Sequence, residues 1–262
     1  MKILFRKILR SIVKYFCLIA INKHNLEIIA VGGWYGTDIS REAVYTILKK
    51  SGKKVRRIIH SPTVDWDIPL TILGIRSVPN NVFVWIFELA KSAVRLLFLK
   101  SNPSTLVLQI NSQDTGIMKY WMSFVHPDVV IMLNSHAGTL NLELLLVENV
   151  KPSGLLIVNN DNMRTKSLAQ GKNSGIIYFG EKGKNPPEYY FSVVNNTLQL
   201  GHANEIYPLQ KTFPEFTYPF LSASSAIAQY YSLVFKDVCE ALNYFELPSD
   251  KIHTLFSKFV EE

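Results

Sequence analysis

Short apolar runs alternate with amphipathic segments along most of this chain, and the alternation constrains its fold more than any other feature. Runs rich in Val, Ile and Leu are typical of strands buried on both faces, whereas apolar residues three or four positions apart are typical of helices. This order of segments predicts an α/β fold, with a mostly parallel sheet covered by helices on both faces. The predicted strands are 26–31, 55–60, 105–110, 129–133, 155–158 and 176–179, and the predicted helices are 39–50, 82–99 and 116–124.

Both ends of the chain depart from this alternation. Residues 2–21 have the spacing of an amphipathic helix, in a basic segment 1–25 that precedes a domain over 26–262. Residues 189–209 contain short alternating segments broken at Asn195-Asn196 and Gly201-His202, so they predict a small β-hairpin appendage over 189–211. The segments 222–244 and 249–259 predict helices that close the domain.

The positive charge of the chain is concentrated near its N-terminus. Six of its 28 Lys and Arg residues lie within residues 1–25, which hold no acid, so the rest of the chain carries 22 basic and 21 acidic side chains. A domain with such balanced charge has no electrostatic reason to bind nucleic acid, and we expect no nucleic-acid partner.

Two interpretations of the N-terminal helix remain open. Its uncharged run, residues 15–21, is shorter than the roughly 20 apolar residues that span a bilayer, and no small-residue cleavage site follows it. The helix either lies on an anionic membrane surface or packs on the domain with its cations in water. The cations that would contact lipid are Arg6, Lys7, Arg10 and Lys14.

The two cysteines indicate a reducing environment. Cys17 and Cys239 match no metal-binding or disulfide spacing. We expect both to be reduced and mostly buried thiols of a cytoplasmic protein, which is peripheral on the inner membrane face if the N-terminal helix binds lipid.

A glycine-containing loop joins the first predicted strand to the first predicted helix. Residues 28–42 read IIAVGGWYGTDISRE and are similar to the start of the central domain of Mur ligases, where a strand leads into T-G-T-N-G-K-T-T-T-K-E. Further matches follow in the same order over residues 26–260. Six short segments each resemble a family motif. PLTIL at 69–73 resembles G-V-P-L-T-L-L, LVLQ at 106–109 resembles V-L-E-M-G, and GIMKY at 116–120 resembles P-G-E-I-x-Y. HPDVVI at 126–131 resembles R-P-D-V-A-V-I, VNNDN at 158–162 resembles L-N-A-D-D, and FG at 179–180 matches the family's F-G.

This resemblance implies an ATP-binding domain of P-loop-type topology. Within the family, the chain looks most similar to the ligase that adds the D-Ala-D-Ala dipeptide to the peptidoglycan precursor. ATP and Mg²⁺ are the cofactors implied if any activity remains. The family's N-terminal domain for the UDP-sugar precursor and its C-terminal domain for the incoming amino acid or dipeptide are expected to be absent.

The residues that handle ATP in the family are replaced in this sequence. A phosphate loop offers backbone N–H groups to the phosphates, with a Lys on the β/γ-phosphates and a Ser or Thr hydroxyl on Mg²⁺. Thr37 stands at the Lys position, Asp38 at the Thr position, and Gln109 at the position of a Glu that holds Mg²⁺. An amide brings no negative charge to a metal. Gly33 and Gly36 either keep a phosphate cradle or only permit the tight turn.

Other candidates follow from the later motifs. Asn159 and Asp161 fall where the family contacts its nucleotide, so they are candidates for weak nucleoside binding. Thr139 stands at the position of the family's later histidine, and we expect nearby His136 to take a polar role in a loop.

Two further candidates come from segments that depart from the family pattern. Lys151 is a shifted candidate for the lysine that the family carbamylates to bridge metal ions. Asp65 and Asp67 form a pair of closely spaced carboxylates, which we expect to lie in a solvated turn.

The replaced residues and the expected loss of two domains favour a degenerate, non-catalytic Mur-ligase-like protein. Its role would be interaction or regulation in peptidoglycan precursor synthesis, with an active cell-wall ligase or a subunit that supplies the missing domains as partner. The alternative is an ATP-dependent amide ligase that uses shifted residues or a partner subunit. A third hypothesis is a membrane-surface protein, in which the domain is held on anionic lipid by its basic helix.

Overall fold

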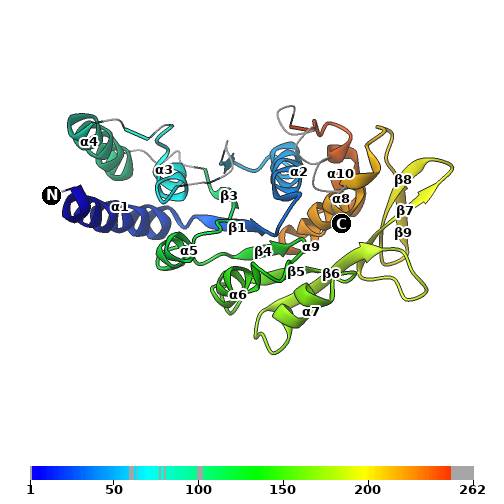
Figure 1. The fold of residues 1–262 in the computed structure, drawn as a ribbon. Helices are drawn as coiled ribbons and strands as arrows, with labels where there is room; N and C mark the ends of the chain where they lie inside the picture. The colour runs from blue at the N-terminus through cyan, green and yellow to red at the C-terminus, as the bar shows by residue number, and fades with distance from the viewer. Residues whose placement is uncertain are drawn as a thin grey trace.

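A nine-stranded sheet forms the centre of the computed structural model (Figure 1). The structure describes residues 2–248 apart from 59–61, 63, 77, 80 and 99–102. In the described chain the strands lie in the order β2-β3-β1-β4-β5-β6-β7-β8-β9. All pairs from β2 to β7 are parallel, and the last two pairs are antiparallel. The strands are β1 Glu27–Gly32, β2 Val55–Arg57, β3 Thr105–Gln109, β4 Val129–Met132, β5 Leu155–Asn159, β6 Gly175–Glu181, β7 Tyr189–Val194, β8 Thr197–His202 and β9 Glu205–Pro208.

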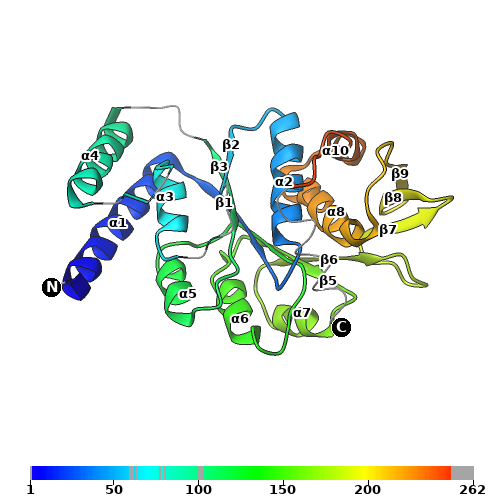
Figure 2. The same ribbon diagram turned by 45° about the horizontal axis from the view of Figure 1, so that its top comes forward.

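Helices cover both faces of this sheet (Figure 2). Because side chains alternate along a strand, Ile29 and Val31 of β1 pack in a core with α2, α8 and α10, while Ile28 and Ala30 pack in a second core with α1, α3, α5 and α6. The helices are α1 Lys2–His24, α2 Thr37–Lys50, α3 Asp67–Leu73, α4 Val82–Phe98, α5 Thr115–Met122, α6 Leu140–Glu148, α7 Met163–Ala169, α8 Tyr218–Ser225, α9 Ile227–Tyr231 and α10 Phe235–Leu242. The predicted α/β class is therefore confirmed.

The observed elements differ from the predicted ones mainly among the short helices. All six predicted strands are present, but α3, α6 and α7 were not predicted, because each has only seven to nine residues and shows little periodicity. The predicted helix over 222–244 is broken into pieces, and Ser232 ends α9 in the left-handed conformation with a φ of 50°. The predicted helix over 249–259 lies outside the described residues.

The predicted hairpin over 189–211 consists of β7, β8 and β9. It is continuous with the main sheet, because β7 pairs in parallel with the end of β6 while β8 and β9 fold back in antiparallel register. Asn195 and Asn196 form the turn between β7 and β8 with φ values of 49° and 59°, a conformation that asparagine tolerates better than most residues.

The N-terminal helix α1 packs on the domain. Its side chains at i, i+4, i+8 and i+11 are buried against the sheet and α3, so the second interpretation of this helix describes its position in the structure. These residues are Leu9, Val13, Cys17 and Ala20. Neither cysteine forms a disulfide, and burial raises the pKa of the Cys17 thiol and raises the pKa of Cys239 to about 12, as expected for inert buried thiols.

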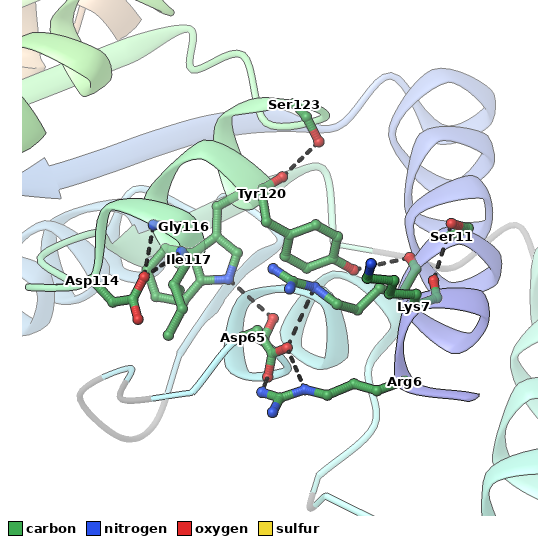
Figure 3. Close-up of polar contacts among 11 residues, drawn as sticks. Arg6, Lys7, Ser11, Asp65, Asp114, Gly116, Ile117, Tyr120 and Ser123 are labelled. Atoms are coloured by element: carbon green, nitrogen blue, oxygen red, sulfur yellow. Dashed lines mark hydrogen bonds and ion pairs between the residues drawn. The ribbon is translucent and has the colours of Figure 1, made fainter. Parts of the chain in front are cut away.

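Asp65 anchors α1, and the prediction that it lies in a solvated turn was wrong. Its carboxylate is buried and lies 3.0 Å from Nη2 of Arg6 (Figure 3). It also lies 3.4 Å from Nε of Arg10. The indole of Trp121 donates a hydrogen bond to the Asp65 carbonyl, and Arg10 also lies 4.1 Å from the centre of the Tyr120 ring. Two of the four cations predicted to face lipid therefore pair with a carboxylate of the domain.

None of the helices in the described part of the chain is long and apolar enough to cross a bilayer.

Candidate functional site

The glycine loop lies between β1 and α2, where Asn134 closes it from the end of β4. The Asn134 Oδ1 atom accepts hydrogen bonds from the backbone N–H groups of Trp34 at 2.6 Å and Tyr35 at 3.1 Å, and its Nδ2 donates to the Tyr35 carbonyl at 3.0 Å. Gly33 has a φ of 144° and passes so close to Asn134 that an added β-carbon would lie 3.1 Å from Oδ1. The neutral amide oxygen of Asn134 thus accepts hydrogen bonds from two backbone N–H groups of this loop.

Gly36 is packed against α8 at the start of α2. It has a φ of 74°, and a β-carbon there would lie 2.2 Å from the ring of Phe220. The hydroxyl of Ser40 donates to the Phe220 carbonyl at 3.0 Å, which fixes α8 against the first turn of α2. This glycine is therefore required by both backbone conformation and packing.

Thr37, at the lysine position of the family, belongs to a buried polar network. Gln109 Nε2 donates to Thr37 Oγ1 at 2.8 Å, and Arg41 Nη1 donates to Gln109 Oε1 at 2.8 Å. All three residues are buried. Glu42 lies 2.9 Å from the Arg41 guanidinium and 2.6 Å from that of Arg57, so one carboxylate is shared by two cations.

This network does not fit the ATP and Mg²⁺ implied by the resemblance. The Gln109 oxygen accepts from the Arg41 guanidinium, so a divalent cation bound there would have to displace a charged hydrogen-bond donor. Thr37 provides no charge for a phosphate. Asp38 is buried in the first turn of α2, where its Oδ1 accepts from the Ile39 N–H at 3.0 Å, and its carboxylate would repel a phosphate.

The predicted nucleoside contacts are held by a separate set of hydrogen bonds at the end of β5. Asn159 Nδ2 donates to the Leu133 carbonyl at 2.8 Å, and its Oδ1 accepts from the Asp161 N–H at 2.8 Å. Asp161 Oδ2 accepts from the Glu181 N–H, also at 2.8 Å. Asn159 ends β5 and Asp161 follows it in the turn, at the same edge of the sheet as the loop, and their hydrogen bonds join β5 to its neighbours.

A small cavity lies beside the loop, between the end of β3 and the start of α6. Its volume is about 110 Å³, and Gly33, Trp34, Asn111, Thr139 and Glu143 are among the residues that line it. The Glu143 carboxylate accepts from the Thr139 hydroxyl at 2.8 Å and from the Ser135 hydroxyl. Burial raises the pKa of Glu143 above its ordinary value, and these hydrogen bonds partly oppose the shift.

Two other predicted residues have local roles. His136 is exposed, stacks on Trp34 with ring centres 5.1 Å apart, and accepts from the Gly138 N–H, which agrees with the polar loop role. Lys151 lies 2.6 Å from Asp128, whose other oxygen accepts from the Ile28 N–H. Lys151 therefore lies at the amino ends of β1 and β4, at the opposite edge of the sheet from the loop. The prediction that it is a shifted metal-site lysine was wrong.

The pH dependence of stability is expected to reveal the buried carboxyl of Glu143. A pKa raised in the folded state means that the neutral form stabilises the fold fully below the unfolded pKa, and that this stability is lost as pH rises through the folded pKa. Glu143→Gln is neutral at every pH, so in urea unfolding its stability relative to the natural protein should rise as the pH is raised above the ordinary pKa of a glutamate. Glu148→Gln on the same helix, with a side chain 49% exposed, is the control, and an equal trend in both variants would contradict a burial effect.

Comparison with solved structures places this geometry in a known fold. No protein-family model matches the sequence, and no curated protein matches it either. MurF from Acinetobacter baumannii is similar with a TM-score of 0.70 at 16% identity, over 95% of this chain and 51% of that chain. A pseudomurein peptide ligase type C from Methanothermus fervidus gives a TM-score of 0.63 at 14% identity, over 85% of this chain and 50% of that chain. MurF ligase from Thermotoga maritima in complex with ADP gives 0.62 at 12% identity, over 87% and 52%.

These similarities define the class of fold. A mostly parallel sheet whose first strand ends in a glycine loop places the chain among α/β domains of P-loop-type topology. More particularly, the chain has the fold of the Mur ligase central domain, which confirms the fold implied by the ordered motifs. It spans about half the length of the proteins named above.

Several residues of the site were not singled out from the sequence. Asn134 and Phe220 contact the loop from 99 or more positions away, and no local pattern links them to it. Arg41 looks like an ordinary basic residue in a helix, and Glu143 lies in a helix that was not predicted. The position of Arg41, one turn after the glycine loop, was the one feature of the sequence that could have indicated a cation near the loop.

Proposed function

We propose that this domain is a non-catalytic Mur-ligase-like module with an interaction or regulatory role in peptidoglycan precursor synthesis. The observation that carries the proposal is that side chains of the protein itself form hydrogen bonds with the loop and with the predicted metal position. Asn134 accepts from two N–H groups of the loop, and the Gln109 oxygen accepts from the buried guanidinium of Arg41. Groups that would bind phosphate and metal instead bind one another.

The hydrogen bonds among these side chains support the proposal that the domain keeps its fold for a role other than catalysis. Thr37, Gln109 and Arg41 are each at most 4% exposed and are joined by hydrogen bonds of 2.8 Å. Leaving any one of them unpaired would cost about 1–3 kcal/mol, so the network stabilises the domain without a ligand. The partner that we propose is an active cell-wall ligase or a subunit that carries complementary domains.

The alternative function is an ATP-dependent amide ligase with shifted residues. One observation favours it: the Glu143 carboxyl, with a raised pKa, lines a cavity beside Gly33 at the carboxyl ends of the strands, where α/β domains bind ligands. The cavity of about 110 Å³ is smaller than the roughly 300 Å³ at which ligand pockets begin, so it holds at most a small group.

Calorimetric titration with ATP and Mg²⁺ distinguishes these two functions. We expect no saturable heat up to ~1 mM ATP, because the loop lacks a counter-charge and its metal position faces a guanidinium. We expect none with adenosine either, because the side chains of Asn159 and Asp161 bond to backbone groups of the protein itself. Binding at micromolar concentration, with Mg²⁺-dependent ATP hydrolysis above that of a Thr37→Ala variant, would establish the ligase instead. An active Mur ligase measured in parallel shows that the titration detects binding.

A regulatory role has its own readout. The rate of phosphate release by a purified ligase that adds D-Ala-D-Ala should change when this protein is added at stoichiometric concentration. Equal rates with and without the protein, for each of the cell-wall ligases of the same cell, would contradict regulation of those enzymes while leaving the titration result unaffected.

A further inference from the structure

Helix α4 presents an apolar stripe to solvent. Trp85 and Ser92 are buried on its inner side, whereas the side chains at i, i+3, i+4 and i+11 on the outer side are more than half exposed. These outer residues are Phe83 at 83%, Ile86 at 60%, Phe87 at 65% and Val94 at 55% exposure. A helix that is apolar on its outer as well as its inner side has a second surface to bury.

Helix α1 adds a second apolar stripe beside it. Ile8, Ile12 and Tyr15 follow one another at i, i+4 and i+7 and are 51%, 42% and 64% exposed. The two helices pack against each other at the end of the molecule that is farthest from β7–β9 (Figures 1 and 2). We call the seven residues of these stripes the α1/α4 apolar surface. They are Ile8, Ile12, Tyr15, Phe83, Ile86, Phe87 and Val94.

The charges around this surface are predominantly positive. Residues 1–25 hold six cations and no acid, and α4 holds one acid, Glu88, which lies 3.7 Å from Lys91. Arg6 and Arg10 are partly neutralised by Asp65, as Figure 3 shows for Arg6. Lys7 is exposed and Lys14 partly exposed on α1, and no ion pair joins either to an acid among the described residues.

We infer that the α1/α4 apolar surface docks on the surface of an anionic lipid bilayer, with both helices lying in the plane of the interface. Apolar side chains enter the boundary between headgroups and acyl chains, while lysines such as Lys7 and Lys14 meet the acidic headgroups. A second copy of the chain is a poorer occupant, because a symmetric contact would bring the same cations together. Charge complementarity therefore selects acidic lipid.

The paired substitution Phe83→Gln and Phe87→Gln tests this inference. Both rings are exposed and Gln is a good helix former, so the fold is expected to persist, which circular dichroism and thermal melting verify. Flotation of the full chain with vesicles that contain about 30% phosphatidylglycerol in phosphatidylcholine should show at least roughly tenfold weaker binding for this variant. Met163→Gln with Val193→Gln, at exposed apolar positions of α7 and β7, is the matched control and should bind as the natural protein does.

A second variant tests the electrostatic contribution. Lys7→Gln with Lys14→Gln should weaken binding to the acidic vesicles and leave the ion pairs of Asp65 intact, and vesicles of phosphatidylcholine alone should bind the natural protein poorly. Equal binding by the Phe83/Phe87 variant and the natural protein would overturn the inference. Absence of binding to the acidic vesicles by the natural protein would also overturn it. If light scattering then showed a dimer that the Phe83/Phe87 variant converts to monomer, the surface would join two copies instead.

Discussion

Replacing Gly36 by alanine is expected to lower the free energy of unfolding by about 2–5 kcal/mol. The new β-carbon would lie 2.2 Å from the Phe220 ring, and the residue would keep a φ of 74°. Overpacking a well-packed site costs typically about 1–3 kcal/mol, and a left-handed conformation costs an alanine about 1–2 kcal/mol more. Urea unfolding followed by tryptophan fluorescence measures the sum.

Gly52→Ala separates these two contributions. Gly52 has a φ of 77°, and an added β-carbon would have nothing within 4 Å, so only the conformational cost of about 1–2 kcal/mol is expected. Phe220→Leu in the Gly36→Ala background should recover part of the stability by making room for the β-carbon. Equal losses in the Gly36 and Gly52 variants would show that contact with Phe220 does not restrict this loop.

Replacing Asp65 by alanine is expected to cost about 2–4 kcal/mol and to loosen α1. The Asp65 side chain is 1% exposed, and it accepts from two guanidinium groups of α1 that would both lose their partner. Hydrogen bonds to charged groups contribute about 1.5–3 kcal/mol each, reduced here because the Arg6 side chain is 59% exposed and can regain water. Urea unfolding gives the total loss, and amide hydrogen exchange should show faster exchange in α1.

Glu240→Ala provides a matched control for the Asp65 prediction. Glu240 pairs with Lys236 one turn earlier in α10 at 3.8 Å, with both side chains about three-fifths exposed, so its loss should change stability by less than about 0.5 kcal/mol. A loss below 1 kcal/mol for Asp65→Ala would mean that Leu9, Val13 and Cys17 hold α1 without help from the ion pairs.

The strands of this fold were predictable because burial on both faces leaves a local mark. Residues 106–108 and 129–133 form uninterrupted apolar runs, and each run lies between two parallel neighbouring strands. The short helices α3, α6 and α7 left no such mark, whereas α5 has a similar length but a clearer apolar face than α6. The breaks between α8, α9 and α10 depend on tertiary packing that one sequence does not display.

The candidate site was predictable in composition but not in its contacts. The sequence predicted that Thr37, Asp38 and Gln109 differ from the motif of the similar family, whereas the hydrogen bond from Arg41 to Gln109 joins residues 68 positions apart. Asp65 was misjudged for the same reason: its partners Arg6 and Arg10 precede it by more than 50 positions. Turn propensity describes a loop aspartate well only when no distant cation reaches it.

The shared carboxylate of Glu42 also limits how much positive charge this loop can accept. Thr37→Lys alone would place a third cation in a buried network where Arg41 and Arg57 already share one acid. The repulsion and desolvation of that ammonium would lower stability before any nucleotide compensated for it. Thr37→Lys should therefore lower stability less in a variant that has already lost the charge of Arg41 than in the natural protein.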